Sequence, residues 1–319
     1  MNKLKCAVIG VGYLGSFHAE KYANLSDAEL VGVCDIDLKH CKAIAKKYKT
    51  TPFNDYKLLI GKVNAVSITT PTTQHYQLAK FFLENNVHVL VEKPITTTVE
   101  EAEELIKLAN ENQLVLQVGH LERFNSVLNY IEPKLENPKF VESIRLSPFK
   151  PRGTDVNVIL DLMIHDIDII QYLIRSPIQS IEAIGAPVIS ADNDITNARI
   201  KFENGCIANV TASRVSIKQE RKLRIFQPTA YMSLDLHNKE INLYQKGKGK
   251  MLAGIPNIKH EHKVFDKGDA IKAEIIAFLD SIKNKKPAVV SGEDGKKALA
   301  TAIEITNMVR EYTKTLEML

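Results

Sequence analysis

The stretch Lys5-Cys6-Ala7-Val8-Ile9-Gly10-Val11-Gly12-Tyr13-Leu14-Gly15 decides the fold of this 319-residue chain. A short apolar run enters three glycines at Gly-x-Gly-x-x-Gly spacing, and residues 16–25 follow a helical pattern. The next apolar run, residues 28–34, ends at Asp35. Glycines in this place allow a tight turn and let the backbone approach a pyrophosphate at the start of the helix. The order strand, glycine turn, helix, strand, acid predicts a dinucleotide-binding unit.

The acid at position 35 also bears on which cofactor binds. A carboxylate there would accept hydrogen bonds from free ribose hydroxyls and would repel a 2′-phosphate, and Ile36 and Asp37 follow it instead of an arginine. The sequence therefore favours NAD over NADP. The residues expected to bind the cofactor are Gly10, Gly12, Tyr13, Leu14, Gly15, Asp35, Thr70, Pro71, His75, Glu92 and Lys93. His75 is explained equally well as a polar residue that starts a helix.

The alternation of strands and helices continues to about residue 120. Apolar runs at residues 65–70, 87–91 and 114–118 are separated by helical patterns, which predicts a doubly wound parallel sheet. The run 87–91 stops at Glu92-Lys93-Pro94, because proline cannot donate to a sheet ladder. Ligands bind at the carboxyl ends of such strands. Lys93 could be a solvated surface amine, but a dinucleotide site on the same edge favours a catalytic role.

The pattern changes after residue 120, which predicts two domains, residues 1–120 and 121–319. Strand-like segments separated by turn signals predict one large, open, mostly antiparallel sheet in an α+β domain. Residues 245–268 are basic and contain several glycines, which favours a loop, and helices are expected at residues 270–284 and 293–312. The last helix could pack back on the first domain. An uncovered sheet face predicts a homo-oligomer, either a dimer or a tetramer.

Composition excludes several classes of function. The net charge of +4 is small and dispersed, which argues against nucleic-acid binding. The four cysteines form no Cys-x-x-Cys pair and no zinc spacing, so we expect no metal site and a cytoplasmic protein. We find neither a signal-peptide pattern nor an apolar run of the ~18 residues that a membrane helix needs.

A second group of candidate residues lies in the apolar segment 157–174. Asp161 and His165 are four residues apart and share one helix face, and Asp168 lies three residues further on the same side. Two carboxylates flanking an imidazole on an apolar helix are costly unless they are paired or functional. A core histidine with solvent-facing acids is the alternative. In a chain that binds a dinucleotide, we interpret Asp161 and His165 as catalytic.

Together these motifs resemble one family. The glycine motif, Asp35, Glu92-Lys93-Pro94, Asp161-x-x-x-His165-Asp166-x-Asp168 and Gly292-Glu293-Asp294-Gly295 resemble the Gfo/Idh/MocA oxidoreductases over nearly the whole chain. The resemblance implies an N-terminal Rossmann domain, a C-terminal domain with an open sheet used for oligomerisation, and a tightly held nicotinamide cofactor.

One departure from the family bears on the substrate. Many polyol dehydrogenases of the family have a Gly-Gly pair where this chain has Asp155-Val156-Asn157. Gly119-His120-x-x-Arg123-Phe124-Asn125 with the segment from Asp161 resembles members that oxidise the 3-hydroxyl of UDP-N-acetylglucosamine, a step toward 3-amino sugars of lipid A. The substrate-binding residues expected from this are His120, Arg123, Lys150, Arg152, Asp161, His165 and Arg214, the cations serving a diphosphate.

These residues suggest a reaction path. His165 would accept the hydroxyl proton, Lys93 would donate to the reacting oxygen, and Asp161 would bind a neighbouring hydroxyl or orient His165. Lys93 and His165 could exchange the role of base. Two alternatives stay open: a dehydrogenase of inositol or a free monosaccharide, and a non-catalytic, dinucleotide-sensing regulatory protein. A sensor would need only the glycines and Asp35.

Overall fold

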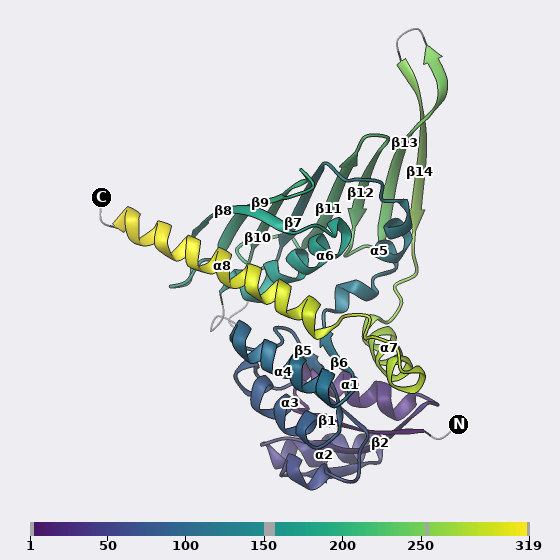
Figure 1. Ribbon diagram of the computed structural model, residues 1–319, viewed down its shortest axis with the longest axis vertical. Coiled ribbons are helices and arrows are strands. Elements are labelled where there is room, and N and C mark those ends of the chain that lie inside the picture. Colours follow the sequence, from purple (N-terminus) through teal and green to yellow (C-terminus); the bar gives the residue numbers. More distant parts are fainter. Residues whose placement is uncertain (1–2, 150–156, 253–254, 318–319) are drawn as a thin grey trace. The chain divides into compact units, whose positions relative to one another are not determined.

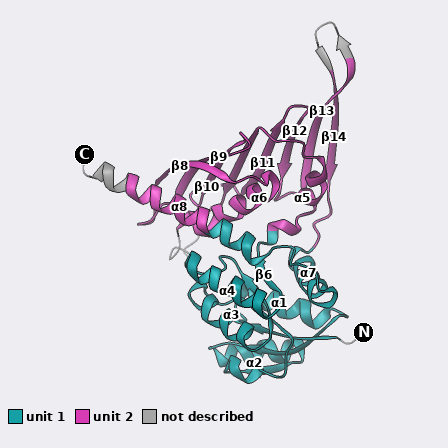
Figure 2. Cartoon of the chain, in the orientation of Figure 1, with its two compact units in different colours: residues 1–121, 269–299 teal, residues 122–268, 300–319 magenta. Residues whose placement is uncertain are grey.

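The computed structural model describes residues 3–149, 157–252 and 255–317, and they form two compact units (Figures 1 and 2). Unit 1 comprises residues 1–121 and 269–299, and unit 2 comprises residues 122–268 and 300–319. The long helix α8, Gly292–Glu317, contributes its first part to unit 1 and the rest to unit 2. Within the described ranges, no helix is long and apolar enough to cross a membrane.

Unit 1 contains a six-stranded parallel sheet in the order β3-β2-β1-β4-β5-β6. The strands are β1 Leu4–Ile9, β2 Ala28–Cys34, β3 Thr51–Phe53, β4 Ala65–Ile68, β5 His88–Glu92 and β6 Leu116–Gly119. The helices between them are α1 Tyr13–Asn24, α2 Leu38–Tyr48, α3 His75–Glu84 and α4 Val99–Glu111, with 3-10 turns at η1 Tyr56–Leu59 and η2 Thr72–Gln74. This is the strand order of a Rossmann fold, as predicted, and it reverses between β1 and β4.

A later segment completes the core of unit 1. Helix α7, Ala270–Asn284, follows the last strand of unit 2 and returns to unit 1. Its residues Ile275, Phe278 and Leu279 are buried in the same apolar cluster as Val8 and Tyr22. Each apolar side chain that is fully buried stabilises the fold by about 1.5–3 kcal/mol. Burial of these side chains therefore holds α7 against α1.

The Gly292-Glu293-Asp294-Gly295 motif begins α8 and packs against β6. A Cβ on Gly292 would lie 2.8 Å from Ile106, and one on Gly295 would lie 2.7 Å from Val118. The Asp294 carboxylate accepts hydrogen bonds from both the backbone N–H and the hydroxyl of Ser291, which fixes the start of the helix. The two glycines therefore allow α8 to pack closely against both α4 and β6.

Unit 2 contains an eight-stranded sheet in the order β14-β13-β12-β11-β7-β10-β9-β8, in which only β7 and β10 pair in parallel among the described strands. The strands are β7 Phe140–Leu146, β8 Ile178–Ala186, β9 Ile195–Phe202, β10 Ile207–Ser213, β11 Glu220–Gln227, β12 Ala230–Asp235, β13 Glu240–Leu252 and β14 Ile255–Val264. The prediction of one large, mostly antiparallel sheet is confirmed.

Short helices complete unit 2. They are η3 Leu121–Phe124, at the passage from unit 1, then α5 Ser126–Ile131, η4 Glu132–Lys134, the π-helix η5 Ile159–Met163 and α6 Ile164–Ile174. Helix α6 packs on β7 and β10 (Figure 1). Along β7 the buried residues are Val141, Ser143 and Arg145, so this face of the sheet lies against α6 and the alternate residues point away.

The prediction of a loop at residues 245–268 is wrong. Residues 245–252 and 255–264 belong to strands β13 and β14, which pair as a hairpin that extends from one edge of the sheet (Figure 1). Lysine and glycine are weak strand formers, but contacts between side chains on the two paired strands stabilise the hairpin. Tyr244 stacks on His260 with ring centroids 4.4 Å apart. Gly249, at φ +81°, lies where the pairing register shifts, which is the backbone conformation of a bulge.

Candidate active site

The predicted cofactor residues of unit 1 lie along one edge of its sheet. Strands β1, β4, β5 and β6 are neighbours, so the Gly10–Gly15 turn, Thr70, Lys93 and His120 all follow carboxyl ends of adjacent parallel strands. The edge lies where the strand order reverses, which is the place of ligand binding in open α/β sheets. The structure thus brings together, in unit 1, residues that the sequence separates by more than a hundred positions.

The three glycines of the turn meet different steric demands. A Cβ on Gly15 would lie 1.9 Å from the Gly10 carbonyl oxygen, so only glycine lets α1 pack there. Gly10 has φ +82°, a conformation that glycine adopts without strain. At Gly12 no atom lies within 4 Å of the Cβ position. Gly12 is also the N-cap of α1 and makes no side-chain cap bond. This open helix start fits a pyrophosphate group.

Asp35 is tied to the glycine turn. Its Oδ2 accepts a hydrogen bond of 2.7 Å from the backbone N–H of Val11, and its Oδ1 accepts one of 2.9 Å from that of Asp37. The carboxylate is half-buried, while the neighbouring Ile36 side chain is fully exposed. The Asp35 carboxylate is therefore held in a fixed orientation beside the glycine turn, Gly10–Gly15. An acid that binds ribose hydroxyls requires such a fixed position.

The segments that follow β4 and β5 are linked through the side chain of His75. The buried Oγ1 of Thr70 has no hydrogen-bond partner among the residues that the structure describes, so a ligand hydroxyl or amide could satisfy it. The ring of His75 is buried, with Nε2 2.8 Å from the Thr70 carbonyl and Nδ1 2.8 Å from the Pro94 carbonyl. Burial lowers the pKa of His75. Both ring nitrogens contact the backbone, so a direct bond from His75 to a cofactor stays a prediction.

Glu92 turns back into the interior of unit 1. It is 7% exposed, and its Oε1 lies 3.2 Å from Nε2 of the buried His18 on α1. Its other oxygen lies 2.7 Å from where a Cβ on Gly119 would be, so the glycine at the end of β6 makes room for this carboxylate. The peptide bond between Lys93 and Pro94 is cis. Sequence reasoning missed His18, although it shares the buried face of α1 with Gly15, Ala19 and Tyr22.

The Asp161–His165 segment of unit 2 begins with a polar cap and a π-turn. The Asn157 side-chain oxygen accepts bonds from the backbone N–H groups of Ile159 and Leu160. The π-helix η5 contains Asp161, and His165 follows in the first turn of α6. Such π-turns occur frequently at functional sites. Both Asp161 and His165 are half-buried, so a ligand can reach them.

The two other acids of this segment are structural. Asp166 is buried and accepts bonds of 2.5 Å from Arg145 Nε and 2.8 Å from the Ser143 hydroxyl. Asp168 is buried and paired by two bonds with Arg123, at 2.7 and 2.8 Å. Of the two explanations open for Asp168, paired or functional, the structure supports pairing, because a buried carboxylate requires a cationic partner. The pattern could have suggested this, since i+3 and i+4 acids on an apolar helix need partners.

The predicted phosphate-binding cations have different surroundings. Arg123 is buried and its guanidinium also lies 4.0 Å from the centroid of the Tyr172 ring. Arg214 is buried too, and its Nε lies 2.8 Å from Asp194 Oδ1. It is therefore not a solvated surface cation. Lys150 and Arg152 lie outside the described residues. Substrate contacts by these four residues and by the buried His120 stay predictions.

Comparison with known proteins gives the family. Residues 4–120 match the model described as an oxidoreductase family with an NAD-binding Rossmann fold, and residues 141–230 match the GFO/IDH/MocA C-terminal domain. UDP-N-acetylglucosamine 3-dehydrogenase of Acidithiobacillus ferrooxidans is 37% identical over 313 residues, covering 98% of this chain and 99% of that protein. The chain belongs to the Gfo/Idh/MocA family. It is an oxidoreductase that acts on CH–OH groups and has an NAD-binding Rossmann domain.

Solved structures of Gfo/Idh/MocA proteins share its fold. That of the A. ferrooxidans dehydrogenase has a TM-score of 0.91 at 35% identity, covering 98% of this chain and 99% of that chain. The Bacillus subtilis scyllo-inositol 2-dehydrogenase (NAD(+)) is 24% identical, covering 97% of this chain and 95% of that protein. A scyllo-inositol dehydrogenase structure from Lactobacillus casei, with bound NAD(H) and scyllo-inositol, has a TM-score of 0.82 at 20% identity, covering 98% of each chain. Inositol dehydrogenases are thus the more distant relatives.

Proposed function

We propose that this enzyme is an NAD-dependent dehydrogenase that oxidises the 3-hydroxyl of UDP-N-acetylglucosamine to a ketone. The support for the substrate is the 37% identity, over nearly the full length of both chains, to a protein of that activity. The observation that carries the chemistry is the difference among four polar residues of one segment. Asp166 and Asp168 are buried in ion pairs, whereas Asp161 and His165 are accessible. The accessible pair is therefore the part of this segment that a substrate can reach.

NAD is the proposed cofactor, in preference to NADP. The support is the Asp35 carboxylate, fixed by the N–H groups of Val11 and Asp37. It would accept hydrogen bonds from the ribose hydroxyls and repel a 2′-phosphate. The remaining proposed contacts are the turn residues Gly10, Gly12, Tyr13, Leu14 and Gly15, followed by Thr70, Pro71, His75, Glu92 and Lys93.

The proposed mechanism divides the work between a base and a charge stabiliser. NAD, when bound, accepts the hydride that leaves the substrate carbon. His165 accepts the hydroxyl proton, for which an imidazole is suited at neutral pH. The Lys93 ammonium donates to the same oxygen and stabilises the charge that develops on it. Asp161 binds a neighbouring hydroxyl or orients His165. The opposite assignment, with Lys93 as base, is the variant of this mechanism to be tested.

The remaining proposals concern the surroundings of the reaction. Residues 1–120 bind the cofactor, and residues 121–319 bind the substrate and form the oligomer. Lys150, Arg152, Arg123 and Arg214 are the candidates to meet the diphosphate, with His120 near the sugar. The product would be a 3-keto sugar nucleotide, which an aminotransferase could convert to a 3-amino sugar for lipid A. The four buried, free cysteines are consistent with the proposed cytoplasmic location.

We also propose a homo-oligomer formed through the open sheet of unit 2. The face opposite α6 has a row of rings in contact that crosses five neighbouring strands: Phe140, Phe226, Tyr231, Tyr244 and His260. Phe226 and Tyr244 are each more than a third exposed. A contiguous aromatic row on a sheet face is typical of a surface that another chain covers. Light scattering of the wild type and of Tyr231→Lys tests this, since a monomeric wild type would exclude it.

A substrate panel tests the proposed function. NADH formation is measured with UDP-N-acetylglucosamine, UDP-glucose, free N-acetylglucosamine, myo-inositol and scyllo-inositol at equal concentrations. We expect turnover with UDP-N-acetylglucosamine and, when product is reduced with borodeuteride, deuterium at C3. Turnover only with inositols or free sugars would replace the proposed substrate with the polyol alternative. Tight NAD binding without turnover of any sugar would favour a sensor.

A further inference from the structure

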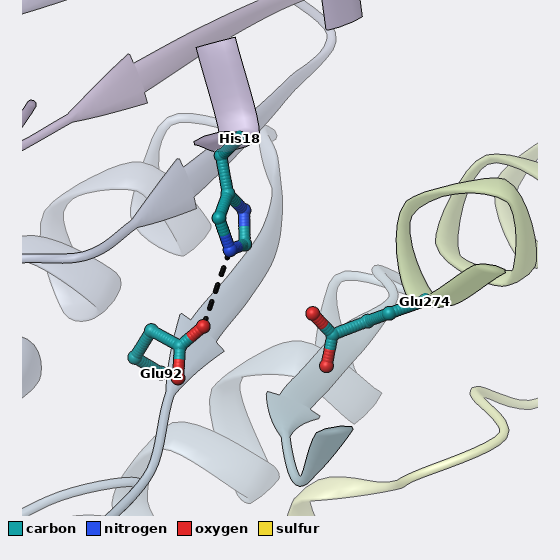
Figure 3. Close-up of side chains that lie close together, drawn as sticks. All are labelled: His18, Glu92 and Glu274. Atoms are coloured by element: carbon teal, nitrogen blue, oxygen red, sulfur yellow. Dashed lines mark ion pairs between the residues drawn. The ribbon is translucent and has the colours of Figure 1, made fainter. Parts of the chain in front are cut away.

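Three ionisable side chains meet inside unit 1, away from the exposed ends of the strands. Figure 3 shows His18 of α1, Glu92 of β5 and Glu274 of α7 pointing toward a common centre. One nitrogen or oxygen atom of each lies within 4.8 Å of those of the other two. The three elements that carry these side chains are not consecutive in the sequence. Only the folding of unit 1 brings them together. Only Glu92 borders a residue of the proposed mechanism.

Glu274 is the least expected of the three. It is 0% exposed, and neither of its carboxyl oxygens has a hydrogen-bond partner among the described residues. Burial, together with the charge of Glu92, raises its pKa well above the ordinary value of 4.5. Its helix is fixed from two sides, by Ile275 and Phe278 in the core and by Gln117, whose amide donates to the Glu274 carbonyl at 3.1 Å. An unpaired buried carboxylate would be very costly, so Glu274 is kept as the neutral acid.

Two of the three side chains lie close to Glu92. His18 Nε2 is 3.2 Å from Glu92 Oε1, and the neutral acid of Glu274 adds an O–H donor to the group. One carboxyl oxygen of Glu274 lies within 4.8 Å of one of Glu92, a separation that one bridging water spans. The other titratable group facing Glu274 is Tyr22 of α1, whose hydroxyl lies 2.9 Å from that of Ser67 and whose pKa is raised by burial. Ionised Glu274 would instead place two like charges in one buried site.

We propose that His18 and Glu274 are positioning residues that hold the Glu92 carboxylate in place and, through it, hold Lys93 at the reacting oxygen. The inference rests on the proposed role of Lys93. His18 fixes Glu92 from the helix that begins at the phosphate turn, and Glu274 fixes it from α7. On the other side of Lys93, the Pro94 carbonyl contacts the buried ring of His75. Buried side chains therefore hold both neighbours of Lys93, Glu92 and Pro94.

Two substitutions of Glu274 separate a positioning role from bulk packing. Glu274→Met keeps the approximate volume and removes the donor, whereas Glu274→Gln keeps a neutral donor. We expect Glu274→Met to lower kcat by about tenfold or more, the usual effect of losing a hydrogen bond to a charged group, with KM for NAD within about twofold. Glu274→Gln should restore most of kcat. Asp280→Asn, on the exposed side of the same helix, is the matched control and should match the wild type.

The pH dependence of kcat gives a readout that a merely structural residue would not change. Ionisation of Glu274 at alkaline pH would disturb Glu92, so the wild-type kcat should fall on an alkaline limb that moves to higher pH, or disappears, in Glu274→Gln. The assay uses whichever sugar the wild type oxidises, so failure of the substrate proposal does not affect it. An unchanged alkaline limb in Glu274→Gln, or wild-type kcat in a folded Glu274→Met, would overturn the proposal.

Metal content supplies an independent readout. Two carboxylates and an imidazole within 4.8 Å of one another are also a spacing that a divalent cation accepts. The purified protein is assayed for zinc, manganese and iron by plasma mass spectrometry before and after dialysis against EDTA. We expect less than a tenth of an equivalent, in line with a group neutralised by protons. One equivalent of metal that is lost in both Glu274→Gln and Glu92→Gln would overturn the proton assignment.

Discussion

His18 Nε2 lies 3.2 Å from Glu92 Oε1, and both side chains are buried. The pair joins the helix that follows the phosphate turn to the strand that ends at Lys93. In unit 1, therefore, this contact links the glycine turn, where we propose that the cofactor binds, to the strand end that carries the proposed catalytic lysine.

The glycine turn offers a matched pair of substitutions. Gly15→Ala places a Cβ 1.9 Å from the Gly10 carbonyl, so we expect it to destabilise the fold by about 1–3 kcal/mol and to abolish NAD binding. Gly12→Ala meets no atom within 4 Å, so stability should stay unchanged while the Kd for NAD rises about tenfold or more. Thermal melts and calorimetric titration with NAD distinguish the two effects. A Gly12→Ala protein that binds NAD as the wild type does would show that no pyrophosphate approaches this residue.

The preference for NAD should depend on Asp35. Asp35→Ala removes the carboxylate that accepts from Val11 and Asp37 and that would repel a 2′-phosphate. We expect the ratio of kcat/KM for NADP to that for NAD to rise by about tenfold or more. Steady-state rates with both cofactors measure this ratio. If the variant keeps the wild-type preference, another residue sets cofactor choice.

The Arg123–Asp168 pair should contribute strongly to the stability of unit 2. Arg123→Met leaves the buried Asp168 carboxylate without its two hydrogen bonds, which we expect to cost about 3–5 kcal/mol. Arg123→Met combined with Asp168→Leu should recover much of this loss. Arg175, at the end of the helix α6 that contains Asp168, pairs with Glu132 from an exposed position. Arg175→Met should lower the free energy of unfolding by less than about 1 kcal/mol. Urea unfolding of the four proteins gives the comparison, and equal losses for both arginines would contradict the assigned roles.

The raised pKa of Glu274 predicts how stability depends on pH. Above the ordinary value of 4.5 the unfolded chain releases this proton while the folded protein keeps it, so folding loses stability as pH rises toward the folded pKa. Glu274→Gln has no such proton. We therefore expect the variant to gain stability relative to the wild type as pH rises above 4.5, by up to about 1.4 kcal/mol per pH unit, until the folded pKa is reached. Urea unfolding at several pH values measures this gap, which should be absent for Asp280→Asn. A gap that is constant with pH would show that Glu274 does not hold a proton.

Local patterns predicted the edge of unit 1 well. The glycine turn, Asp35 and Glu92-Lys93-Pro94 are all marked by short motifs at strand ends, and a parallel sheet places such ends together without further information. The i, i+4 spacing of Asp161 and His165 suggested their roles, which stay predictions, and the comparisons confirm the family resemblance.

Long-range contacts could not be predicted in this way. Glu274 meets Glu92 only because α7 returns to unit 1, and His18 meets it only because α1 packs beside β5 in the folded unit. Likewise the sequence left open whether Asp168 is paired, because its partner, Arg123, lies 45 residues away. The β13–β14 hairpin was missed because its composition suggests a loop, while cross-strand stacking such as Tyr244 on His260 exists only after pairing.

The most direct test of the central claim is NADH formation from UDP-N-acetylglucosamine by the wild type, Lys93→Ala and His165→Ala, with NAD binding measured on the same samples. The account predicts turnover by the wild type, a loss of about 10²–10³ in kcat or more in each variant, and a Kd for NAD within a few-fold of the wild type. Full turnover by either variant, or a wild type that binds NAD and oxidises no sugar, would contradict it.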